Sequence, residues 1–406
     1  MPTTIRTADV RELLALVPFQ LGFRPTESAV LVSLRGARSR VGLVARVDLA
    51  DLAAEDDGAT ARSLVGHLLV DGARRALVVL YTAADLQRPG CSGASGNEAD
   101  RTARAAAEAV CSAAADAFGE TETWVVGPHG YYALGCDDGE CCPAGGRPLE
   151  ELQATRVGAQ MVLEGLLVAP TREDLVRLPV ATAAERKAAR RAAERWRVRG
   201  AAASPGAAAH RWRRDGLALW REALTTALAV RAGRAGPCPA PSGAPHAPGS
   251  PAVFGGRVVG AGAPTAMGRL LAALDDVLVR DAVLLSFVEG NDRVADRVVA
   301  GETGPAIAQA LAAITDPAQG RRPDPIRSGA ARRVLEHAVA HATRGMHAPG
   351  LTLLAVLAWW EGDGARAGVL VDRALAADAT YRLALLVDQA LRAGMPPGWV
   401  RGTRAG

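Results

Sequence analysis

Three cysteines stand close together in the segment YYALGCDDGECCPAGG, residues 131–146. Cys136, Cys141 and Cys142 follow the pattern C-x4-C-C-P, and His129 lies shortly before them. Zinc in proteins prefers thiolate and imidazole ligands, usually four in a tetrahedral array supplied by C-x2–4-C or H-x3–5-H pairs. Adjacent cysteines on an extended backbone point in different directions, so binding of one ion by both requires an unusual loop. These four residues are the candidate ligands of a zinc ion.

The same thiols suit three other roles. A redox role requires a thiolate at neutral pH, but three neighbouring acids disfavour a negative sulfur, and Arg147 is the one cation close in sequence. A disulfide within the loop would crosslink it, although the reducing conditions of the cytoplasm, where we expect this protein, oppose such a bond. Small, half-buried thiols in a tight Gly/Pro loop at the end of a strand are the interpretation that the spacing favours.

A second pair of candidate ligands is His337 and His341, in HAVAH. One helical turn separates the two, a geometry that can chelate a metal. Glu336 precedes the pair and cannot act as the intervening base of an H-E-x-x-H motif, and His347 is the nearest further histidine. We favour a solvated helix face for this pair.

Residues 185–214 carry ten basic and two acidic side chains, whereas the whole chain has a net charge of +4. Arginines neutralise phosphates and tryptophans stack on bases, so this run with Trp196, Trp212 and Trp220 is a candidate nucleic-acid surface. The alternative is an amphipathic helix whose tryptophans pack in the core, since Trp212 and Leu219 fall near one helical face. The candidate phosphate contacts are Arg190, Arg191, Arg195, Arg211, Arg213 and Arg214.

Several classes of protein are excluded by what the sequence lacks. Lys187 is the only lysine and is followed by alanine, so the phosphate loop G-x-x-x-x-G-K-[ST] is absent. No G-x-S-x-G elbow occurs. No apolar run reaches the roughly 18 residues that span a bilayer, and charged residues interrupt the apolar start of the chain, unlike an export signal. We expect a cytoplasmic protein without a membrane span, whose cysteines are thiols.

Strands and helices are expected to alternate between residues 25 and 135. Apolar runs predict strands at 27–36, 40–49, 75–82, 121–128 and 130–135, and helical periodicity predicts helices at 7–17, 60–73 and 98–119. Thr7 is a plausible cap of the first helix, and Pro18 and Gly22 are expected to end it. The alternation predicts an α/β layer, a mixed sheet with flanking helices, that ends in the cysteine segment.

Composition divides the chain into four parts. Residues 1–178 are the predicted α/β domain, and residues 179–231 are a predicted basic helical arm. Residues 232–264 contain seven prolines and are a predicted linker. Residues 265–406 are predicted to form an all-α domain.

One tetratricopeptide unit fits residues 351–379, where small or aliphatic residues at fixed offsets let two antiparallel helices pack closely. A second unit would bury Asp388 and Gln389, so the last long helix is predicted to cap the domain. A generic helical hairpin is the alternative. The matching positions are Leu351, Leu354, Ala355, Ala358, Ala367, Val371, Ala374 and Ala379.

A family resemblance rests on three stretches: ELLALVPFQLGFRPTESAVLVSLRG, the C-x4-C-C-P motif, and LAWWEGDGARAGVLVDRALAADATYRLALLVDQAL. Together they resemble the bacterial family catalogued as domain of unknown function 4192, over nearly the whole chain. The resemblance implies an architecture and brings no assigned activity.

Stacked helical hairpins present concave surfaces suited to a peptide or a partner protein. We therefore expect a non-catalytic binding, regulatory or scaffold protein that engages a protein partner through its tetratricopeptide-like domain. No catalytic residue is assigned, and no cofactor is expected beyond the candidate zinc. One alternative is an enzyme with a metal-assisted or thiol-containing pocket near residues 136–142 and His129. Another is a nucleic-acid-associated factor that uses residues 186–214.

Overall fold

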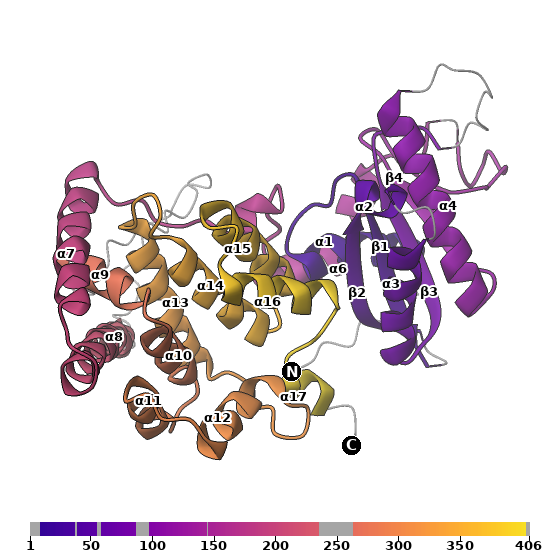
Figure 1. Ribbon diagram of the computed structural model, residues 1–406. Coiled ribbons are helices and arrows are strands. Elements are labelled where there is room, and N and C mark those ends of the chain that lie inside the picture. The colour runs from indigo at the N-terminus through magenta and orange to yellow at the C-terminus, as the bar shows by residue number, and fades with distance from the viewer. Residues whose placement is uncertain are drawn as a thin grey trace. The chain divides into compact units, whose positions relative to one another are not determined.

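The computed structural model describes residues 9–36, 39–54, 58–86, 97–143, 145–234 and 263–402. They divide into an N-terminal unit that ends at Leu175 and a C-terminal unit that begins at Val176 (Figure 1). The mixed α/β character expected for the first part and the helical character expected for the second are both confirmed. Most of the predicted linker, residues 235–262, lies outside the described residues.

The N-terminal unit is built on a mixed sheet. Its strands are β1 (Ser28–Arg35), β2 (Arg40–Asp48), β3 (Ala73–Tyr81), β4 (Glu122–Val126) and β5 (Tyr131–Ala133). They lie in the order β2-β1-β3-β4-β5. β3 and β4 are parallel, and the other three neighbouring pairs are antiparallel. A parallel pair needs a long crossover, which here contains the alanine-rich helix predicted at 98–119.

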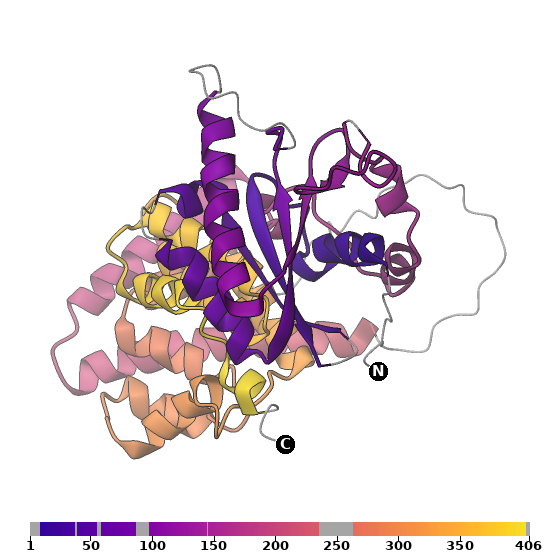
Figure 2. The ribbon, with the colours of Figure 1, turned by 90° about the vertical axis from the view of Figure 1, so that its right-hand side faces the viewer.

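Helices cover both faces of this sheet. They are α1 (Val10–Leu21), α2 (Leu49–Ala53), α3 (Ala59–Val70), α4 (Glu98–Phe118), α5 (Glu150–Gln153) and α6 (Arg156–Leu163). Helices α2, α3 and α4 share one hydrophobic core with the sheet, and α1 shares another with the opposite face. Figure 2 shows the sheet nearly edge-on between these layers. Helices α5 and α6 pack against α1.

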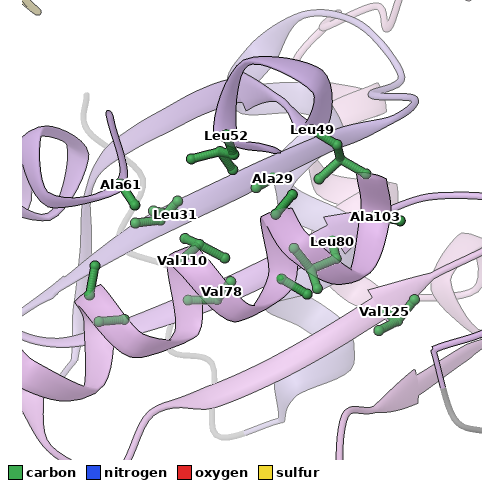
Figure 3. Close-up of a cluster of buried hydrophobic side chains, with 14 of the residues drawn as sticks. Ala29, Leu31, Leu49, Leu52, Ala61, Val78, Leu80, Ala103, Val110 and Val125 are labelled. Atoms are coloured by element: carbon green, nitrogen blue, oxygen red, sulfur yellow. The ribbon is translucent and has the colours of Figure 1, made fainter. Parts of the chain in front are cut away.

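Alternate residues of the central strands enter the two cores. Leu31 and Val78 point towards Val110 of α4 in the first core (Figure 3). Val30 and Val79 lie in the second core with α1. Because both faces are covered, these strands are continuous apolar runs, as is typical of buried strands.

Helix α1 extends beyond its predicted end. It continues through Pro18, so the expectation that this proline ends the helix is wrong. Pro18 costs one backbone hydrogen bond, but Leu14 and Val17 are buried against the sheet and hold the last turns in place. Gly22, with a φ of 79°, ends the helix. The predicted cap Thr7 lies outside the described residues.

A buried carboxylate ties β1 and β2 to the turn before β3. The fully buried side chain of Asp71 accepts hydrogen bonds from Arg35 Nε at 2.6 Å and from the Leu43 N–H at 2.9 Å. Burial opposes ionisation of this carboxyl, but the hydrogen bonds outweigh burial and lower its pKa. Gly42 leaves the room that the ion pair occupies, since a Cβ there would collide with both side chains.

We expect Asp71→Asn to lower the free energy of unfolding of the N-terminal unit by about 2 kcal/mol at neutral pH, because hydrogen bonds to a charged acceptor are the stronger ones. A lowered pKa means that this stabilisation is complete above pH about 4 and is lost as the pH falls below it. Urea unfolding at pH 7 and pH 3 should therefore show the deficit of the variant shrinking in acid. Glu122→Gln, at the exposed Arg75–Glu122 pair, is the control and should cost less than about 0.5 kcal/mol. Equal losses in the two variants would contradict the expectation.

Helices dominate the C-terminal unit. They are α7 (Ala183–Ala201), α8 (Ala207–Arg234), α9 (Pro264–Ala273), α10 (Val277–Leu285), α11 (Asp292–Val299), α12 (Pro305–Thr315), α13 (Pro325–Ala340), α14 (Ala348–Trp360), α15 (Gly364–Ala377), α16 (Arg382–Arg392) and α17 (Gly398–Gly402). The segment predicted as a basic arm forms α7 and α8. Helix α7 packs along α9, and α8 packs against α9, α10 and α13.

Helices α14 and α15 form the hairpin predicted at 351–379. The positions that match the tetratricopeptide pattern are buried, except Ala379, which is exposed. Every residue of α14 is buried, and α14 packs against α13, α15 and α16. A helix enclosed on all sides is the centre of a bundle, whereas a concave solenoid surface leaves one side of its inner helices exposed.

No helix in the described part of the chain is both long enough and apolar enough to cross a membrane.

Candidate metal centre

The cysteine loop, residues 134–146, leaves the sheet at β5 and returns beside it. The backbone of Tyr131 donates to and accepts from Arg147, at N–O distances of 2.9 Å and 2.8 Å. A Cβ on Gly130 would lie 2.7 Å from the carbonyl oxygen of Gly145, so glycine is needed where the two arms of the loop pass. The loop is therefore closed at its base by backbone contacts.

Asp138 begins a tight turn that holds two of the cysteines. Its carbonyl oxygen accepts a hydrogen bond from the Cys142 N–H at 2.7 Å, and its Oδ1 accepts one from the Glu140 N–H at 2.9 Å. The backbone at Cys141 and Cys142 is consequently coiled, and their sulfur atoms lie 3.9 Å apart. The unusual loop that two adjacent ligands require is present.

The sulfur atoms of Cys136, Cys141 and Cys142 all lie within 4.8 Å of one another. In a tetrahedral site with Zn–S bonds of about 2.3 Å, two sulfurs are about 3.8 Å apart. Small side-chain shifts would therefore bring all three to one ion. The backbone N–H of Ala133 donates a hydrogen bond to the sulfur of Cys142 at 3.3 Å, which favours negative charge on that sulfur.

Cys142 belongs to the core between the sheet and α4. Burial raises its pKa to about 11, with a further contribution from the two neighbouring thiols. Without a cation this cysteine is a thiol at neutral pH, which counts against a redox role. A bound cation offsets both the burial and the crowding of negative sulfurs, because a thiol that coordinates a metal loses its proton.

The fourth candidate, His129, does not join the three thiols. It is exposed in the turn between β4 and β5 and is not part of the group. The carboxylate of Asp138 is engaged by the backbone of its own turn. No fourth ligand atom from a described residue completes the group. A tetrahedral ion held here takes three ligands from these residues and its fourth from water or another molecule.

Among the other described cysteines, Cys111 does not contribute to the cluster. Cys111 lies on α4 with its sulfur 3.4 Å from the hydroxyl oxygen of Thr123. Burial raises the pKa of its thiol. Cys91 and Cys238 lie outside the described residues.

The histidine pair on α13 is not a solvated face. His341 is 3% exposed, its Nδ1 lies 2.8 Å from the carbonyl oxygen of His337, and the two rings pack edge to face. The prediction is wrong for His341, which is buried at the end of a helix, α13, that packs against α14. Burial lowers the pKa of His347, at the start of α14. In the described ranges these histidines join no group of three ligands.

The candidate nucleic-acid residues differ in their surroundings. Arg190 and Arg191 line a cavity of about 640 Å³, whereas Arg213 Nε lies 2.9 Å from an Asp276 oxygen in an ion pair. Arg213 is half-buried, and the other five arginines are exposed: Arg190, Arg191, Arg195, Arg211 and Arg214.

The tryptophans of the basic run are packed in the C-terminal unit. Trp220 is fully buried and donates to the hydroxyl of Ser286 at 2.8 Å, and Trp196 is 6% exposed. The indole N–H of Trp212 donates to the Trp196 carbonyl oxygen at 3.1 Å. The interpretation that these tryptophans dock in the core is confirmed for Trp196 and Trp220, which are therefore not available to stack on bases.

Sequence reasoning missed two backbone features of the metal centre. One is the turn at Asp138, for which the Asp138–Gly139 dipeptide is a usable signal. The other is the N–H of Ala133 at the end of β5, which no pattern of side chains indicates.

Fold and cluster together define a class: a mixed α/β unit that holds three clustered thiols, followed by a helical unit. The chain belongs to the family described as Domain of unknown function (DUF4192), which matches residues 11–398. The family resemblance in the sequence is thus confirmed. Comparison with curated proteins and with solved structures gave no significant match.

Proposed function

We propose that the protein is a non-catalytic metal-binding protein whose N-terminal unit holds a zinc ion with Cys136, Cys141 and Cys142. The observation that carries this proposal is the approach of the three sulfur atoms to within 4.8 Å of one another. Thiolates select zinc, copper(I) or iron–sulfur clusters over magnesium and calcium. Iron–sulfur clusters commonly need four cysteines, so zinc fits this set better.

The donor set favours a structural or regulatory ion over a catalytic one. Three thiolates more than neutralise the charge of Zn²⁺, and three acids stand in the same loop. A water on such an ion gains little acidity, whereas catalytic zinc sites use mainly neutral histidine ligands to produce hydroxide. The ion would tie the cysteine loop to β5 and to the core beneath α4.

The metal content of untagged, reduced protein tests the proposal. We expect one zinc per chain, and we expect Cys141→Ser and Cys142→Ser each to weaken zinc binding more than about 100-fold, beyond the effect of residues outside the ligand set. Cys111→Ala is the matched control, because Cys111 is a half-buried thiol in the same core, and it should retain the metal. Cobalt(II) bound in place of zinc should show thiolate-to-metal charge-transfer absorption that weakens in the two serine variants.

Two results would contradict the proposal. One is a wild-type protein that stays metal-free in excess zinc while its thiols are reduced. The other is equal zinc loss in Cys111→Ala and Cys142→Ser. Copper found in the protein in place of zinc would be consistent with the three cysteine ligands but would contradict zinc as the bound ion.

Binding of a partner protein through the helical unit stays a proposal of lower rank. Such binding requires an exposed concave surface on the tetratricopeptide-like hairpin. Because α14 is buried on all sides, the structure gives no support for that surface. The nucleic-acid alternative ranks lower too, because Trp196 and Trp220 are packed in the core.

A further inference from the structure

A cationic cavity lies in the C-terminal unit. It measures about 640 Å³ and is lined by α7, the segment that joins α9 to α10, and the loop that joins α13 to α14. This volume is within the range of small-molecule sites. Its charged lining residues are Arg190, Arg191, Arg197, Arg344, Glu194 and Asp275.

The charges in this cavity do not balance. Arg197 Nε donates to Asp275 at 2.8 Å, so this pair is satisfied within the lining. Arg190, Arg191 and Arg344 form no ion pair with any residue that the structure describes. Glu194 is the remaining acid of the lining. Positive side chains gathered in a concave site focus a field that attracts anions.

The elements that carry these arginines are held in place. Helix α7 lies so close to α9 that a Cβ on Gly268 would collide with the backbone of Ala189. In the loop before α14, Met346 is buried, and its sulfur accepts a hydrogen bond from the Thr343 hydroxyl at 3.1 Å. Arg344 lies between Thr343 and Met346 in this loop. The site therefore requires little backbone ordering when a ligand binds.

A second cavity of about 300 Å³ shares Arg197 and Asp275 with the first. Its wall includes small residues of α7, α8 and α9 and the indole of Trp212. An apolar or planar group can lie here while an attached anion reaches the arginines beyond the Arg197–Asp275 pair.

We propose that these two neighbouring cavities together bind a small molecule that carries a diphosphate or triphosphate group. The phosphates contact Arg190, Arg191 and Arg344, since guanidinium groups match phosphate oxygens in bidentate pairs. The organic part lies against Trp212. A nucleic acid is the less suitable ligand, because these three arginines line a single cavity, and Trp196 and Trp220, which could stack on bases, are buried.

Calorimetric titration of the full-length protein with pyrophosphate and with ADP tests the proposal. We expect both to bind, ADP more tightly because its organic part also occupies the second cavity. Arg190→Gln and Arg344→Gln should each lower the affinity at least tenfold, as expected for loss of a charge-assisted hydrogen bond. Arg195→Gln is the matched control: Arg195 is exposed on the same helix, as Arg190 is, but does not line the cavity, and the change should alter affinity less than twofold. Unchanged circular dichroism should accompany all three variants.

Several outcomes would overturn the proposal. Absence of binding by both probes at millimolar concentration would do so. An equal loss in Arg195→Gln and Arg190→Gln would show a diffuse charge effect. Tighter binding of a 20-base-pair DNA duplex, weakened equally by Arg195→Gln, would replace the small phosphate ligand with nucleic acid. Equal affinities for ADP and pyrophosphate would show that the organic part of the ligand does not bind in the second cavity.

Discussion

Removal of the metal with a chelator is expected to lower the midpoint of thermal unfolding of the N-terminal unit by roughly 8–16 °C. An ion that binds only the folded state stabilises it by about 4 kcal/mol when its free concentration is about a thousand times its dissociation constant. For a unit of this size, each kcal/mol corresponds to roughly 2–4 °C. The effect should concentrate at the cysteine loop, whose sulfurs are otherwise held by side-chain packing and weak hydrogen bonds.

Hydrogen-exchange mass spectrometry of the full-length protein can separate the two units. Chelation should increase exchange in peptides that cover residues 131–147, and should leave peptides from the buried helix α14 unchanged. Cys142→Ser should reproduce the effect without a chelator, and adding chelator to this variant should change nothing further. Equal exchange at the loop with and without metal would argue that the ion, although bound, does not organise the loop.

Gly268→Ala is expected to destabilise the C-terminal unit by about 3 kcal/mol or more, despite the higher helix propensity of alanine. A methyl group at this position would overlap the backbone of Ala189. No rotamer can relieve a collision of Cβ with backbone, so α7 and α9 must separate. Because Arg190 and Arg191 lie on α7, the same change should weaken anion binding in the cavity.

Urea unfolding followed by tryptophan fluorescence measures this effect, since six of the seven tryptophans follow residue 176. Gly364→Ala is the control in the same unit: it lies at the start of α15, and a Cβ there meets nothing within 4 Å. It should change stability by less than about 0.5 kcal/mol. If Gly268→Ala unfolded at the same urea concentration as the wild-type protein, the close contact between α7 and α9 at Gly268 would be contradicted.

Local patterns were sufficient to predict most of the elements. Runs such as RALVVLYT are apolar without alternation because both faces of β3 are buried, and the alanine-rich helix α4 follows from its composition. The order of the strands did not follow from such patterns. That β3 lies between an antiparallel and a parallel neighbour depends on where the crossover through α4 places β4.

The helical hairpin shows the same division. The spacing of small residues predicted two closely packed helices, and α14 and α15 are those helices. Apolar residues on every side of α14, among them Val356 and Trp360, indicate that it is enclosed. Only the tertiary structure shows which helices enclose α14, namely α13, α15 and α16. Their packing places this hairpin at the centre of a bundle.

By itself the sequence determined which chemical groups are present and near one another along the chain: three thiols between positions 136 and 142, and arginines gathered between 186 and 214. Tertiary structure alone decided how they can act. The turn at Asp138 brings adjacent sulfurs to one side, and Arg344 and Arg190, more than 150 positions apart in sequence, line the same cavity. The physical reason is that periodicity reports only the neighbours of a residue, whereas a binding site depends on which distant segments pack together.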